Sequence, residues 1–199
     1  MQASPAFEAV PSPHLDGVIA PGKFIRWETQ RGCPFACSFC QHRKKEGGVG
    51  ALSSERIAAE IRLFCQQSPD ADINVLDPTF NTSTAHAVAI LDAFHAHTFT
   101  GRLSLQVRPE KITPAFLDAA ARLGPGRVTL EMGVQTAVAK ELDEIGRVAG
   151  ACSERSLRKV GEKLDLVRAY GLDAEVSLMF ALPHQSVESL RESVGWYNP

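Results

Sequence analysis

The 199-residue sequence lacks several features that would assign it to a specialised class of protein. It contains no run of about 18 apolar residues, so no segment is predicted to cross a membrane. Its net charge is −2, which gives no electrostatic reason to expect nucleic acid or an anionic membrane as a partner. It contains no internal repeat and no low-complexity tract. What remains is a chain long enough for one domain with a substantial core.

The N-terminus shows no cationic segment followed by an apolar one, so no signal peptide is predicted. It holds three prolines within residues 1–13. We interpret residues 1–20 as a linker or N-terminal extension and residues 21–199 as the core domain. The cysteines do not suggest a disulfide framework, which favours a reducing cytoplasm. We expect Cys65 to lie in the core and Cys152 to be a free thiol in a loop.

Three of the five cysteines fall within eight residues, with the spacing C-x3-C-x2-C. They are Cys33, Cys37 and Cys40, and no fourth cysteine lies nearby. A 4Fe–4S cluster normally takes four cysteines, so three would leave one iron open, as catalytic metal sites require. Structural zinc with His42 as fourth ligand is the alternative, and spacing alone makes the two about equal.

Strand-like and helix-like segments alternate along the chain. The predicted strands cover residues 24–30, 72–77, 102–108, 127–132 and 173–180. The predicted helices begin at Ser53 and Thr113 or cover residues 83–98, 138–145, 153–170 and 186–197. Strands that alternate with helices indicate βα units and a parallel sheet.

Within the predicted strands, apolar residues alternate with polar or charged ones. A parallel sheet covered on both faces would instead have continuous apolar runs. The residues expected to face helices include Leu105, Leu130 and Val176. Those expected to face the other side include Arg26, Glu28, Arg108 and Glu131. This pattern favours a wide, incomplete barrel with a polar cavity, and a solvent-exposed sheet face is the alternative.

Residues 28–40, ETQRGCPFACSFC, resemble the signature of the radical S-adenosylmethionine (SAM) superfamily. The resemblance implies that the three cysteines hold a 4Fe–4S cluster, whose fourth iron SAM chelates through its amino and carboxylate groups. It also implies that Phe39, the aromatic residue before the last cysteine, lies near the adenine. The implied fold is a partial parallel (β/α) barrel of five to six units.

Motifs at the predicted strand ends are similar to the radical SAM branch in which a cobalamin-binding domain precedes the core. They are VLDPTFN at 75–81, EMGVQT at 131–136, LDEIGR at 142–147 and SLMFALP at 177–183. Neither the cobalamin-binding domain nor the usual sixth βα unit is found in this sequence. We therefore expect the barrel to be truncated at its C-terminus and the chain to be a piece of a longer enzyme.

The resemblance also assigns SAM-binding roles. Asp77 is expected to meet the SAM amino group, Glu131 the ribose hydroxyls and Arg147 the carboxylate. Weaker cavity candidates are Gln135, Asn81 and Ser177. The alternatives are a loop cap for Asp77, an internal ion pair of Glu131 with Arg108 or Arg26, and a surface position for Arg147.

The implied reaction is reductive cleavage of SAM to methionine and a 5′-deoxyadenosyl radical that abstracts hydrogen from a substrate. The electron is expected from a flavodoxin- or ferredoxin-type donor. With cobalamin, methyl transfer to an unreactive carbon becomes a second outcome. A methylthiotransferase-like enzyme and a non-catalytic zinc- or cluster-binding module are the alternatives. The sequence does not identify the substrate.

Overall fold

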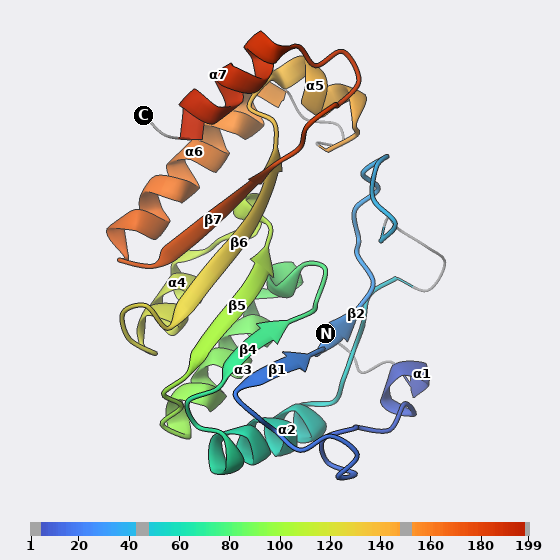
Figure 1. Ribbon diagram of the computed structural model, residues 1–199, viewed down its shortest axis with the longest axis vertical. Coiled ribbons are helices and arrows are strands. Elements are labelled where there is room, and N and C mark those ends of the chain that lie inside the picture. Colours follow the sequence, from blue (N-terminus) through green and yellow to red (C-terminus); the bar gives the residue numbers. More distant parts are fainter. Residues whose placement is uncertain (1–4, 43–47, 148–152, 198–199) are drawn as a thin grey trace.

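The computed structural model describes residues 5–42, 48–147 and 153–197 (Figure 1). Cys152 lies outside these ranges. Within them, no helix combines the length and the apolar character needed to cross a membrane.

Five parallel strands form one curved sheet in the order β1-β4-β5-β6-β7 (Figure 1). Their bounds are β1 Phe24–Trp27, β4 Asp72–Val75, β5 Arg102–Val107, β6 Val128–Gln135 and β7 Asp173–Leu178. Each strand pairs with the next strand of the sheet along the chain, as expected when every crossover contains a helix. The predicted α/β class and the parallel sheet of an open barrel are confirmed.

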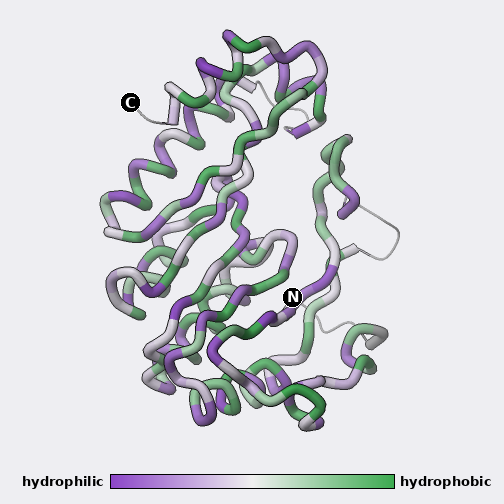
Figure 2. The backbone as a smooth tube through the Cα atoms, viewed as in Figure 1, coloured by the Kyte–Doolittle hydropathy of each residue, from purple (hydrophilic) through white to green (hydrophobic). Residues whose placement is uncertain are grey.

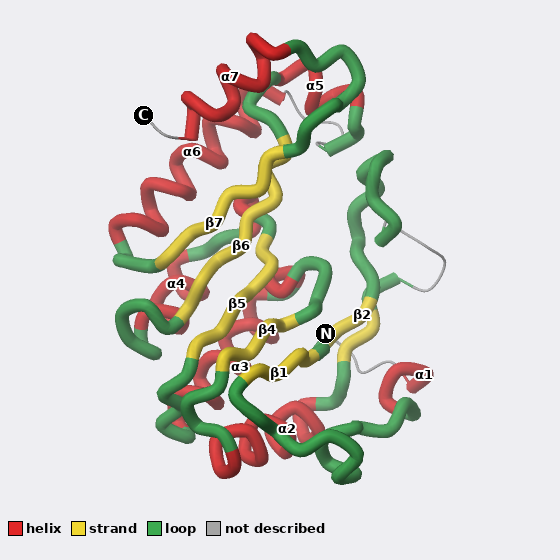
Figure 3. The backbone as a smooth tube through the Cα atoms, in the orientation of Figure 1, coloured by secondary structure: helices red, strands yellow, loops and turns green. Residues whose placement is uncertain are grey.

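Helices follow the strands. They are α2 Ser54–Gln67, α3 Thr84–Ala96, α4 Pro114–Ala121, α5 Ala139–Glu144, α6 Ser153–Ala169 and α7 Val187–Tyr197. All of these except α5, which lies beyond the strand ends, pack against one face of the sheet (Figure 3). Local sequence explains where several of them begin. The Ser53 side chain accepts a hydrogen bond from the Arg56 amide at 3.2 Å, and Thr113 caps α4 in the same way, ahead of Pro114.

Hydropathy alternates along the strands (Figure 2), and the burial of the strand residues alternates with it. Leu105 and Leu130 are fully buried in the apolar core, and Val176 packs against it. On the opposite face, Glu131 and Ser177 line a cavity. A one-residue shift of a strand would exchange its two faces, so this agreement supports the predicted assignment of faces.

The structure adds several short elements that the sequence pattern does not indicate. β2 (Gln30–Arg31) pairs antiparallel with β3 (Gly50–Ala51), which ties the start of the cysteine segment to the chain beyond it. The N-terminal segment begins with α1 (Pro5–Glu8). Two short 3-10 turns, Phe80–Thr82 and Pro109–Lys111, also follow β4 and β5.

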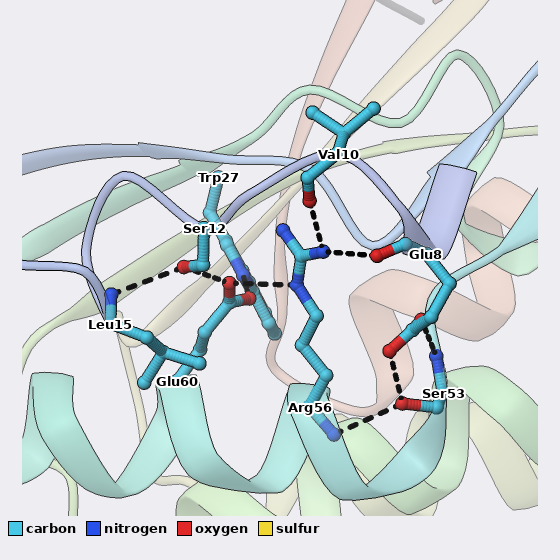
Figure 4. Close-up of polar contacts among 8 residues, drawn as sticks. All are labelled: Glu8, Val10, Ser12, Leu15, Trp27, Ser53, Arg56 and Glu60. Atoms are coloured by element: carbon cyan, nitrogen blue, oxygen red, sulfur yellow. Dashed lines mark hydrogen bonds and ion pairs between the residues drawn. The ribbon is translucent and has the colours of Figure 1, made fainter. Parts of the chain in front are cut away.

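The N-terminal segment packs on α2 through a buried polar network (Figure 4). The Glu60 carboxylate accepts hydrogen bonds from Ser12 Oγ at 2.5 Å and Trp27 Nε1 at 2.7 Å, and Arg56 Nε lies 3.3 Å away. The Arg56 guanidinium also donates to the Val10 carbonyl at 2.6 Å. Val10 and Ser12 are thus held against α2 by hydrogen bonds.

Candidate cofactor site

A cavity of about 290 Å³ lies at the carboxyl ends of the parallel strands, beside the cysteine loop of residues 32–42. In parallel α/β folds this is the end of the sheet where sites are built. Most of the residues predicted for the site line it. They are Cys33, Cys37, Cys40, Phe39, Glu131, Gln135, Arg147 and Ser177.

The cysteine loop depends on a glycine at its start. Gly32 has φ +94°, a conformation that residues with a side chain rarely adopt. A Cβ at this position would also lie 2.5 Å from the carbonyl oxygen of Gly48. The loop therefore leaves β2 along a path that only glycine permits.

The three sulfur atoms have separate partners around the cavity. Cys33 Sγ lies 3.8 Å from Thr79 Oγ1, and Cys37 Sγ accepts a hydrogen bond from Arg108 Nη1 at 3.7 Å. Cys40 Sγ accepts one from the His42 amide at 3.4 Å. All three cysteines line one cavity, and the gathering of their sulfurs around one centre stays a prediction.

Within the described ranges, no three His, Cys, Asp or Glu side chains are grouped closely enough to hold a metal ion. The three cysteines line one cavity but do not form such a group. A single tetrahedral zinc with His42 as fourth ligand would need all three sulfurs bound to one ion. A cluster needs a wider arrangement, because each cysteine binds a different iron.

Asp77 does not line the cavity, contrary to expectation. It is fully buried, and its Oδ1 accepts hydrogen bonds from the amides of Thr29 at 2.7 Å and Gln30 at 3.1 Å. Its Oδ2 accepts a third from Thr29 Oγ1 at 2.5 Å. Burial raises the pKa of Asp77 to about 6, although these hydrogen bonds oppose the shift. The Asp77 carboxylate thus holds the backbone of Thr29 and Gln30, just before the cysteine loop. This is the loop-capping role that we gave as the alternative for Asp77.

Arg147 is buried at the cavity rather than on the surface. Its guanidinium donates to the Gly133 carbonyl on β6. Burial, and then the nearby charge of Arg108, lower the pKa of Arg147. A buried guanidinium whose charge is destabilised in this way would gain from an anionic group in the cavity.

A bulge in β6 directs another predicted residue into the site. The register with β7 shifts between Gly133 and Gln135, and Gln135 has φ +76°. A Cβ on Gly133 would lie 2.4 Å from Gln135 Nε2, so the glycine leaves room for this side chain. Strain of this kind is concentrated at functional sites.

Glu131 contributes the carboxylate of the cavity. It accepts a hydrogen bond from Ser104 Oγ on the neighbouring strand β5. Among the described residues it forms no ion pair, so the expected alternative of a bridge to Arg108 or Arg26 is not observed. Its carboxylate is left available to a ligand in the cavity.

Arg108, which the strand pattern predicted to face the cavity, lines it, although the sequence assigned it no binding role. It follows β5, is 6% exposed, and lies with its guanidinium carbon 3.8 Å from the centre of the Phe35 ring. Asn81, expected in the cavity, instead holds the Arg108 backbone through hydrogen bonds of 2.8 and 2.9 Å. The sequence did contain a signal for Arg108, because it is an arginine on the polar face at the carboxyl end of a predicted strand.

The side chains present fit a 4Fe–4S cluster. Three soft sulfur donors line one cavity, and two buried guanidinium groups accompany them. A cluster with three thiolate ligands is anionic, so it would offset this positive charge. Arg108 Nε has no hydrogen-bond partner in the described structure, as expected of a polar site that is completed by a ligand.

Comparison with known proteins agrees with this chemistry. The chain is 32% identical over 100 residues to the cobalamin-dependent radical SAM methyltransferase TokK of Streptomyces tokunonensis, covering 40% of this chain and 14% of TokK. It is 24% identical over 171 residues to an uncharacterised methyltransferase, PH0819, of Pyrococcus horikoshii, covering 83% of this chain and 35% of the relative. The chain spans only 12 to 35% of the length of the curated relatives it matches.

A solved structure shares the fold. The radical SAM methyltransferase TsrM of Kitasatospora setae, solved with cobalamin and a 4Fe–4S cluster bound, aligns with a TM-score of 0.73 at 20% identity. The alignment covers 88% of this chain and 34% of TsrM.

The sequence family described as the radical SAM superfamily matches residues 27–197. This match includes the cysteine loop and all five parallel strands except the first residues of β1. The chain therefore belongs to the radical SAM superfamily of enzymes, whose cofactors are a 4Fe–4S cluster and SAM.

Proposed function

We propose that this chain is the catalytic core of a radical SAM methyltransferase that acts together with cobalamin bound by another domain. The observation that carries the proposal is the shared cavity of three motif cysteines and two buried arginines at the carboxyl ends of parallel strands. The methyltransferase part is supported by the relatives, since TokK and the Pyrococcus protein are both named as methyltransferases.

The cysteines would each hold one iron, which leaves one iron for SAM. When bound, the cluster and SAM supply reductive cleavage to methionine and a 5′-deoxyadenosyl radical, or the methyl group that cobalamin passes to a substrate. The chain itself binds and orients these groups and limits the access of water.

The other cavity residues offer a partner for each part of SAM. The Arg147 guanidinium would meet the carboxylate, because a planar fork matches two oxygen atoms. Phe39, which is 39% exposed at the cavity, would contact the adenine. Glu131, Gln135 and Ser177 provide polar groups for the ribose and the amino group. In this scheme Asp77 acts on the protein only, through Thr29 and Gln30.

The enzyme would also need a source of electrons. A flavodoxin- or ferredoxin-type protein in the cytoplasm is the proposed donor, because a reducing compartment keeps the three cysteines as thiols. The substrate is an organic molecule with an unreactive carbon, and its identity would be set by parts of the protein beyond this cavity.

The test is product analysis on anaerobically reconstituted protein. The protein, together with the cobalamin-binding domain that the proposal requires, is incubated with SAM, dithionite and hydroxocobalamin, and the products are separated by chromatography. We expect 5′-deoxyadenosine and methylcobalamin, both absent from the Cys37→Ala variant. Cys65→Ala is the matched control, since Cys65 lies on α2 outside the cavity and should retain both products.

Two outcomes would count against the proposal. Formation of 5′-deoxyadenosine without methylcobalamin would contradict the methyltransferase part and favour another radical modification. An iron-loaded protein that yields neither product would contradict both parts.

A further inference from the structure

The Arg108 side chain contacts both the cysteine loop and the Arg147 segment. Its Nη1 donates to Cys37 Sγ at 3.7 Å, and its guanidinium stacks on the ring of Phe35 in the same loop. Its Nη2 donates to the carbonyl oxygen of Arg147 at 2.6 Å. One side chain on the loop after β5 thus joins the cysteine loop to the segment that follows α5.

The backbone of Arg108 is fixed independently of these contacts. Asn81 accepts a hydrogen bond from its amide at 2.8 Å and donates to its carbonyl at 2.9 Å. Both residues are buried. Because the backbone of Arg108 is already fixed, ordering the guanidinium costs only side-chain conformational entropy.

Arg108 and the neighbouring Arg147 have one carboxylate near both of them, that of Glu110. Arg108 Nε lies 3.4 Å from Glu110 Oε2, but neither atom forms a hydrogen bond with good geometry. The nearby Arg147 carries a second positive charge, and the two guanidinium groups repel each other. The positive charge is directed at Cys37, the buried member of the three cysteines.

From this geometry we infer that Arg108 is a positioning residue that holds Cys37 and raises the reduction potential of the cluster. The inference rests on the proposed function. Reduction adds an electron to a site that is already anionic, so a buried cation stabilises the reduced form. Hydrogen bonds to the sulfur atoms, net charge and solvent exposure are the means by which proteins set such potentials.

Two variants separate the charge from the stacking and hydrogen bonds. Arg108→Met keeps much of the shape but removes the charge and the N–H donors. Arg108→Lys keeps the charge but cannot stack as a plane or bond Cys37 and Arg147 together. Arg102→Met is the matched control, because Arg102 lies at the start of β5, the strand that leads to Arg108, and is exposed and paired with Asp72 at 2.8 Å.

The first measurement is a redox titration of the reconstituted full chain, followed by electron paramagnetic resonance. We expect Arg108→Met to shift the equilibrium toward the oxidised cluster by at least about tenfold, which is about 59 mV for one electron. Arg108→Lys should recover most of this shift, and Arg102→Met should match the wild type. An unchanged potential in Arg108→Met, in a wild-type-like cluster, would overturn the inference.

The second measurement needs no cluster. Hydrogen exchange in the cluster-free protein should be faster across residues 33–40 in both Arg108 variants and unchanged in Arg102→Met. Equal exchange in all proteins would contradict the positioning role. A wild-type chain that takes up no iron would instead overturn the proposed function, and with it the redox part of this inference.

Discussion

The Glu60 network on α2 and the arginine pair at the cavity are both buried, yet they are balanced in different ways. In the first, one carboxylate faces one guanidinium, and Ser12 and Trp27 supply the remaining donors. In the second, Arg108 and Arg147 lie together beside one carboxylate, that of Glu110, and Arg108 Nε, 3.4 Å from Glu110 Oε2, forms no hydrogen bond with a described residue. We call the Glu60 network closed, because each of its polar groups has a partner, and the arginine pair open, because one donor has none among the described residues. A closed network stabilises the fold, whereas an open one with excess positive charge is suited to an anionic ligand.

The strongest way to break the closed network is Glu60→Ala. The substitution leaves Trp27 Nε1, Ser12 Oγ and the Arg56 guanidinium buried without their shared acceptor. We expect the free energy of unfolding to fall by about 3–5 kcal/mol, as is typical when one member of a buried pair is removed. Chemical denaturation measures it.

The control for this change is Glu55→Ala, nearer the start of α2, where the side chain is exposed. Its effect should stay within about 0.5 kcal/mol. If the two variants lost equal stability, the network would not be a source of stability.

Asp77 allows a test by pH. Burial raises its pKa to about 6 from a usual 3.8, so the folded protein holds the proton more tightly than the unfolded chain. Its contribution to stability is thus complete below about pH 3.8 and is lost as the pH rises toward about 6. Relative to Asp77→Asn, the wild type should lose up to about 3 kcal/mol over this window, at about 1.4 kcal/mol per pKa unit.

Denaturation curves of the two proteins at several pH values give this difference. The Asp77→Asn variant would keep an oxygen acceptor for the Thr29 and Gln30 amides, so the comparison isolates the titration. Parallel pH profiles, or a wild type that gains stability with rising pH, would refute the assignment.

Arg147 tests the open network. A charge-assisted hydrogen bond is worth about 1.5–3 kcal/mol, so Arg147→Ala should weaken SAM binding by roughly ten- to a hundredfold. Arg147→Lys should recover only part of the affinity, because lysine lacks the two-point contact. Equilibrium binding to the reconstituted protein measures the dissociation constant.

Arg122→Ala serves as its control, since Arg122 is exposed and paired with Asp92. It should bind SAM as the wild type does. An unchanged dissociation constant for Arg147→Ala would assign the carboxylate of SAM to another residue, with Arg108 the next candidate.

The smallest expected effect is that of Gly32→Ala. A left-handed backbone costs a residue with a Cβ about 1–2 kcal/mol, and here the Cβ would also meet the Gly48 carbonyl. We expect a loss of this size in unfolding free energy, whereas Gly22→Ala, with nothing within 4 Å, should have little effect. Equal stability of the two variants would show that the cysteine loop adapts freely.

Much of the fold follows from period-two alternation in the sequence. It identified the five strands and showed that Leu105 and Leu130 face the helices. The β2–β3 pair could not be found in this way, because two-residue strands contain no period. The packing of Ser12 on Glu60 also escaped detection, since it joins residues 48 positions apart.

The sequence predicted most of the residues that line the cavity, but not the hydrogen bonds that they make. The cysteine motif and the strand-end motifs identified residues that share one cavity. Asp77 and Asn81 lie in the same motif, yet their side chains point to the backbone of Thr29 and Arg108. Sequence spacing places a residue at a strand end, whereas hydrogen bonding to neighbouring loops decides its direction.

The most direct test of the account is metal analysis of the anaerobically reconstituted chain. The account predicts iron and acid-labile sulfide near four each per chain in the wild type and in Cys65→Ala. It predicts loss of the cluster when Cys33, Cys37 or Cys40 is replaced by alanine. One zinc per chain without sulfide, or a full cluster in any of these three variants, would contradict it.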